Sequence, residues 1–90
     1  MTDAPASPPL VLLTRRGCCL CEGLEEKLRQ LHLPLEVRDV DADPDLLSRY
    51  GLEVPVLLHP TADGERELPR VSPRLSAAAL ERWLAEQGIP

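Results

Sequence analysis

The chain of 90 residues has no phenylalanine, one tyrosine and one tryptophan. Because large aromatic side chains are nearly absent, leucine and valine must fill most of the core. A chain of this length does not split into two hydrophobic cores. The composition therefore predicts one small domain with an aliphatic interior.

Long apolar runs and excess positive charge are also missing. Runs such as Leu10–Leu13 have only the length of a strand, far below the roughly 20 residues that cross a bilayer. No basic region followed by a long apolar stretch indicates a signal peptide. We therefore expect a cytoplasmic protein with no membrane partner. The net charge of −5 argues against a nucleic-acid partner, because phosphate binding requires a basic surface.

The distribution of apolar residues predicts a disordered N-terminal tail at residues 1–8, followed by a single domain at residues 9–90. Short apolar or alternating runs indicate strands, and apolar residues three and four positions apart indicate helices. Strands are expected at 9–14, 33–38, 54–58 and 66–71, and helices from the cysteines to about His32, between Asp43 and Gly51, and between Ser72 and Gly88.

Turn and cap residues complete this prediction. Asp43 and Ser72 each precede a proline, which is typical of an N-cap followed by the first helical residue. We expect Gly51 to end the short helix in a left-handed conformation. Asp63-Gly64 indicates a hairpin between the last two strands. The order βαβαββα predicts an α/β fold with one four-stranded mixed sheet flanked by three helices.

Three cysteines, Cys18, Cys19 and Cys21, lie within four positions. Such a cluster closes almost no loop and cannot serve as a structural staple, and in the cytosol it is more often catalytic or metal-binding. Cys18 follows a strand at the start of a helix, where unpaired N–H groups and the helix dipole favour a thiolate. Cys21, one turn later, is close enough to resolve a mixed disulfide. Arg15 and Arg16 add positive potential near Cys18.

Other interpretations of the cluster stay open at this point. The cysteines could be small apolar residues that pack the helix start, or half of a zinc site, for which Cys19, His32 and His59 are the other candidates. The three cysteines could also carry an iron–sulfur cluster or a soft metal between two chains. A third alternative is a non-catalytic binding module.

The segment Leu12–Cys21 resembles the active-site strand, loop and helix of glutaredoxin-like proteins of the thioredoxin superfamily. The similarity covers residues 9–87, and the Asp-rich stretch before Tyr50-Gly51 is similar to a small bacterial glutaredoxin-like group. Further matching segments are Val40-Asp41, Leu46-Leu47, Val54–Leu57 and Leu80–Leu84. The resemblance implies a thioredoxin-like fold.

The resemblance also implies roles for individual residues. It implies a cis Val54–Pro55 bond beside the disulfide, with the Val54 backbone free to pair with an extended substrate or partner. Arg15 stands where glutaredoxins have a lysine that contacts glutathione. The Gly-Gly-type motif that holds the γ-glutamyl end of glutathione is missing, because Leu68–Leu75 reads Leu-Pro-Arg-Val-Ser-Pro-Arg-Leu. This departure argues against glutathione as co-substrate.

We therefore expect a monomeric thiol–disulfide oxidoreductase with Cys18 as nucleophile and Cys21 as resolving thiol. Arg15, Val54 and Pro55 are the expected substrate-binding residues. The expected substrates are protein or low-molecular-weight disulfides, and the expected reductant is glutathione or thioredoxin reductase. We expect no bound cofactor and no metal.

Overall fold

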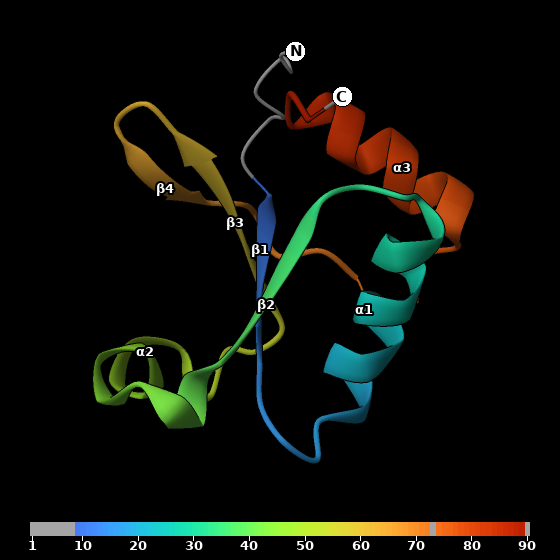
Figure 1. Cartoon of the computed structure of the whole chain (residues 1–90). Helices are drawn as coiled ribbons and strands as arrows, with labels where there is room; N and C mark the ends of the chain where they lie inside the picture. The colour runs from blue at the N-terminus through green and yellow to red at the C-terminus, as the bar shows by residue number, and fades with distance from the viewer. Residues whose placement is uncertain (1–8, 73, 90) are drawn as a thin grey trace, which may run out of the picture.

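The computed structural model describes residues 9–72 and 74–89, and within them the predicted order of strands and helices is confirmed (Figure 1). The expected disordered tail at residues 1–8 lies outside the described residues. One short 3-10 turn, η1, is added after the second strand. The elements are β1 (Leu10–Thr14), α1 (Cys19–Gln30), β2 (Leu35–Asp39), η1 (Val40–Ala42), α2 (Pro44–Tyr50), β3 (Val56–Thr61), β4 (Gly64–Glu67) and α3 (Ala77–Glu86).

The described strands form one mixed sheet in the order β2-β1-β3-β4. β1 runs parallel to β2, with Thr14 opposite Asp39. β3 runs antiparallel to β1, with Leu13 opposite Val56. The carboxyl ends of β1 and β2 and the start of β3 therefore meet at one edge of the sheet, and the loops that extend from this edge are brought together.

Helices cover both faces of the sheet. Figure 1 shows α1 and α3 on one side and α2 on the other. Side chains of β1 alternate between the two faces. Leu10 and Leu12 pack with residues of α1 and α3, whereas Val11 and Leu13 pack with Val40 and with the half-buried residues of α2.

The core is aliphatic, as the composition predicts. Among the described residues, the buried side chains are leucine, valine, one isoleucine and Cys21, and none is polar or charged. Trp83 is half-buried and packs against the cluster beneath α1 and α3. Within the same part of the chain, no helix has the length and apolar character needed to cross a membrane.

Three predicted details of the elements are wrong. Gly51 is right-handed, with φ −54°; a Cβ there would lie 2.6 Å from the Leu47 carbonyl oxygen, so close packing favours glycine at this position. β4 ends at Glu67 because Pro69 has no N–H for a ladder and Leu68 turns into the core. β3 begins at Val56, two residues after the predicted start, and extends to Thr61.

The start of the last helix also differs from the prediction. Ser76, not Ser72, is the N-cap of α3, and its Oγ accepts a hydrogen bond from the Ala79 amide at 3.1 Å. The Ser72 Oγ accepts from the Arg74 amide at 3.2 Å, a contact across two residues. Ser72 therefore stabilises a turn before the helix. The predicted first helical residue, Pro73, lies outside the described residues.

Candidate active site

Cys18 is the N-cap of α1 and has extended backbone angles, φ −90° and ψ 101°. Its Sγ accepts a hydrogen bond from the Cys21 amide at 3.1 Å. Its carbonyl oxygen accepts from the Glu22 amide, and its own amide donates to the Arg15 carbonyl, each at 3.1 Å. The sulfur therefore occupies the place of an N-capping oxygen, at the end of the helix where the dipole stabilises negative charge.

The three cysteines occupy different environments. Cys18 and Cys21 form a disulfide, with their Cα atoms 5.3 Å apart. Cys18 is half-buried, whereas Cys21 is only 1% exposed. Cys19 is exposed and free. Within the disulfide, Cys18 is thus the sulfur that an incoming molecule reaches more easily.

Val54 and Pro55 are half-buried and joined by a cis peptide bond, as the resemblance implies. They immediately precede β3, whose first residue, Val56, pairs with Leu13 near the end of β1. The topology therefore brings Val54-Pro55 to the sheet edge from which the cysteine loop extends.

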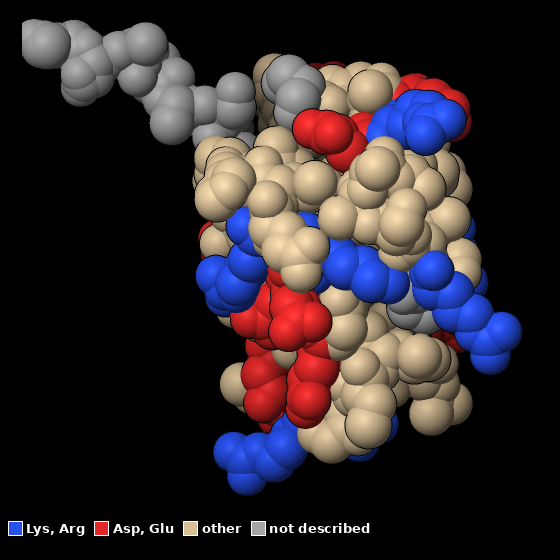
Figure 2. Space-filling model, turned by 90° about the vertical axis from the view of Figure 1, so that its right-hand side faces the viewer, with Lys and Arg blue, Asp and Glu red and all other residues tan. Residues whose placement is uncertain are grey.

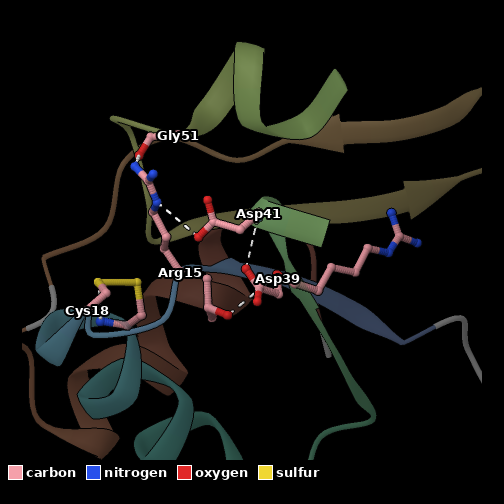
Figure 3. A network of polar contacts seen from close by, with 8 residues as sticks. Arg15, Cys18, Asp39, Asp41 and Gly51 are labelled. Carbon is pink, nitrogen blue, oxygen red and sulfur yellow. Dashed lines mark hydrogen bonds and ion pairs between the residues drawn. A yellow bond between two sulfur atoms is a disulfide. The ribbon is translucent and has the colours of Figure 1, made fainter. Parts of the chain in front are cut away.

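The Arg15 side chain makes contacts that the sequence did not reveal. Its Nε lies 3.1 Å from the Asp41 Oδ2, and its Nη1 donates to the Gly51 carbonyl at 3.1 Å (Figure 3). The parallel pairing of β1 with β2 could have indicated this contact. Their last residues, Thr14 and Asp39, lie opposite each other, so the residues that follow them lie at the same edge of the sheet.

A hollow of about 260 Å³ borders Cys21. It contains more carboxylates than guanidinium groups. Figure 2 shows acidic side chains gathered on the face where α1 lies. The residues that line the hollow are Thr14, Arg15, Arg16, Cys21, Glu22, Glu25 and Asp39.

A second hollow, of about 30 Å³, lies between Pro55 and the chain after β4, a volume with room for only a few water molecules. Glu53 and Arg70, which form an ion pair, both line it. This chain segment, Leu68–Val71, includes the residues that replace the glycine motif of glutaredoxins. Its residues line the small hollow beside Pro55.

No group of three or more histidine, cysteine, aspartate or glutamate residues within 9–72 and 74–89 is arranged to hold a metal ion. His32 follows the end of α1 with φ +58°, and the His59 ring on β3 lies 3.4 Å from Arg66. Neither histidine joins the cysteines in a candidate zinc site.

Arg38 forms a separate ionic cluster between the two edge strands. It donates hydrogen bonds to Glu36 on β2 and to Glu65 on β4, and these contacts raise the pKa of its guanidinium above the ordinary arginine value. Arg38 is therefore a fixed positive charge on the sheet.

Solved structures with similar sequences share this architecture. Protein XcR50 from X. campestris is 34% identical in its X-ray structure, with 86% of this chain and 96% of that chain covered at a TM-score of 0.60. Its solution structure gives a TM-score of 0.64. Protein Ne2328 from Nitrosomonas europaea is 29% identical, with 92% and 98% covered and a TM-score of 0.62.

Thioredoxin 1 from Thermosipho africanus is 16% identical, with 90% of this chain and 99% of that chain covered at a TM-score of 0.51, and this likeness shows the thioredoxin fold alone. No curated protein matches the chain. The model of the glutaredoxin-like domain (DUF836) matches residues 9–85, almost the whole described domain. The chain therefore belongs to the glutaredoxin-like domain (DUF836) family.

Proposed function

We propose that the protein is a thiol–disulfide oxidoreductase in which Cys18 attacks and Cys21 resolves. One observation carries the proposal: the Cys18 sulfur is the N-cap of α1 and accepts the Cys21 amide hydrogen bond, while its disulfide partner is buried. The same amide and the helix dipole would stabilise the Cys18 thiolate in the reduced protein.

The reaction needs two exchange steps. The Cys18 thiolate attacks one sulfur of the substrate disulfide, forms a mixed disulfide and releases one substrate thiolate. The Cys21 thiolate then attacks the Cys18 sulfur, forms the Cys18–Cys21 disulfide and releases the second substrate thiolate. The substrate gains two electrons, and its two thiolates take up the two protons lost by the cysteine thiols. An external thiol or dithiol donor returns the protein to its reduced form by the reverse exchange.

Protein or low-molecular-weight disulfides are the proposed substrates. The Val54 amide donates to the Tyr50 carbonyl, so the Val54 carbonyl, near the cysteine loop, is the group that would accept a hydrogen bond from an extended peptide. Two contacts argue against a glutathione-specific site. Arg15 is bound to Asp41, and the space beside Pro55 is narrow and bordered by Glu53 and Arg70.

A trapping assay tests the assignment of the two thiols. Reduced protein is mixed with a protein disulfide in the absence of glutathione. Cys21→Ser should accumulate a mixed disulfide through Cys18, because release needs a second thiolate one helical turn away. Cys19→Ser is the matched control, since it removes a neighbouring thiol that is exposed and outside the disulfide; it should release its substrate.

Two results would contradict the proposal. If Cys21→Ser turns over normally while Cys19→Ser remains attached to its substrate, Cys19 is the resolving thiol. If neither the native protein nor Cys21→Ser forms any adduct with a disulfide, the domain does not perform thiol exchange.

A further inference from the structure

Three segments that are distant in sequence meet at Arg15. The residue lies in the loop between β1 and α1, its Nε pairs with Asp41 in η1, and its Nη1 donates to the Gly51 carbonyl after α2. Figure 3 shows the side chain reaching from the cysteine loop to both partners. We infer that Arg15 is a positioning residue, which sets the Val54 backbone relative to the Cys18 sulfur and does not bind the substrate itself.

Short hydrogen-bonded links connect Arg15 to both reacting parts. On one side, the Arg15 carbonyl accepts from the Cys18 amide at 3.1 Å. On the other side, the Glu53 and Val54 amides both donate to the Tyr50 carbonyl, at 2.8 and 3.2 Å, which fixes the turn after Gly51. A guanidinium bound to the Gly51 carbonyl therefore connects the cysteine loop to the turn that enters Val54–Pro55.

The chemistry of the contact requires an arginine. A guanidinium presents donors in a rigid planar fork and can bind a carboxylate and a carbonyl in fixed directions, whereas a lysine ammonium is a flexible point charge. Asp41 is itself oriented, because its amide donates to the Asp39 Oδ1 at 2.9 Å. The Arg15 and Asp41 side chains are 39% and 38% exposed. An ion pair this exposed contributes little to the free energy of unfolding. We therefore expect its effect in the rate of thiol–disulfide exchange.

The pairing also affects which disulfides the site favours. Asp41 neutralises Arg15, and Arg29 pairs with Glu25 at 2.8 Å. The other charged groups that line the hollow beside Cys21 are Glu22, Asp39 and Arg16, so its net charge is negative. An anionic disulfide therefore finds no free guanidinium at Arg15 and is repelled by this net charge. This part of the inference rests on the proposed function. It assigns neutral or cationic disulfides as the preferred substrate class.

The experiment compares three disulfides of different charge. Reduced protein is oxidised with oxidised glutathione (anionic), bis(2-hydroxyethyl) disulfide (neutral) or cystamine (cationic), and second-order rate constants are measured for Arg15→Gln, Asp41→Ala and the double variant. A positioning role predicts that both single variants slow the neutral disulfide by about 10-fold, since small misplacements have large kinetic effects. The double variant should be no slower than the slower single variant. Arg15→Lys should not restore the rate.

A substrate-binding role for Arg15 predicts that Arg15→Gln slows oxidised glutathione alone. It also predicts that Asp41→Ala, which frees the guanidinium, does not slow the neutral disulfide. Either result overturns the inference. Arg16→Gln is the matched control for charge, because it removes the neighbouring guanidinium. In a double variant, its effect on the rate constants should simply add to the effect of Asp41→Ala.

Hydrogen exchange separates this inference from the proposed function. In the oxidised protein, Arg15→Gln and Asp41→Ala should both increase exchange of the amides of Glu53 and Val54, whereas Arg16→Gln should not. If exchange increases but the native protein reduces no disulfide, the proposed function is wrong and the positioning contact stands. If exchange at these amides is unchanged in both variants, Arg15 does not position this turn and the inference is wrong.

Discussion

At the scale of single residues, adjacent cysteines acquire different chemistry from small differences in backbone position. Cys18 precedes the first helical residue and lies at the positive end of the dipole, with an amide directed at its sulfur. Cys21 is buried, and Cys19 is exposed to solvent. Burial disfavours a thiolate, whereas an N-cap position favours it. The environments therefore suit Cys18 to attack first.

We expect Cys18 to titrate below the free-thiol pKa of about 8.5. The rate of alkylation against pH, measured in a Cys19→Ser, Cys21→Ser background, gives its midpoint. The matched variant, Cys18→Ser with Cys21→Ser, reports the exposed Cys19 thiol. A Cys18 midpoint at or above that of Cys19 would leave the activated nucleophile without support.

At the scale of elements, the caps decide where each helix begins. Asp43 caps α2 as predicted, with its Oδ1 accepting from the Asp45 amide at 2.9 Å. For α3 the predicted cap, Ser72, is wrong. Ser76, which immediately precedes the helical run, is the observed cap.

The two serines form a matched pair for measuring the cap. Ser76→Ala should lower the free energy of unfolding by about 1 kcal/mol, because the Ala79 amide loses its acceptor. Ser72→Ala removes the same hydroxyl from a turn and should cost less than about 0.5 kcal/mol. Denaturant titration of both variants measures these changes. Equal losses, or a larger loss at Ser72, would contradict the cap assignment.

At the scale of the whole molecule, stability depends on two aliphatic clusters separated by one sheet. Leucine dominates the cluster beneath α1 and α3. Because no phenylalanine is present, many medium-sized side chains must interdigitate, and each contributes through close packing.

Truncation of a core leucine should therefore be costly. Leu28 is fully buried in α1. Leu28→Ala should lower the free energy of unfolding by about 2–5 kcal/mol. Leu52 is 93% exposed, and Leu52→Ala should change stability by less than about 0.5 kcal/mol. Chemical denaturation of the oxidised proteins gives both values. Comparable losses at the two positions would contradict the packing described for α1.

The sequence by itself determined the order of strands and helices, the aliphatic core and the position of the cysteine motif. These features depend on local periodicity, on turn residues and on the absence of aromatic side chains, all of which can be recognised along the chain. The spacing of Cys18 and Cys21 predicted their pairing in the structure. The predictions for the conformation of Gly51 and for Ser72 as a helix cap were wrong. The same local residue pattern can occur at a helix end, in a turn or at a close contact.

Only the tertiary structure decided the partners of Arg15 and the ion pair that borders the hollow beside Pro55. Asp41 and Gly51 are 26 and 36 residues from Arg15, and Glu53 is 17 residues from Arg70. No local pattern links such residues, because their proximity follows from the parallel pairing of β1 with β2 and from the return of β3 beside β1. The sequence thus determined where the cysteine pair lies, and the sheet determined which charges surround it.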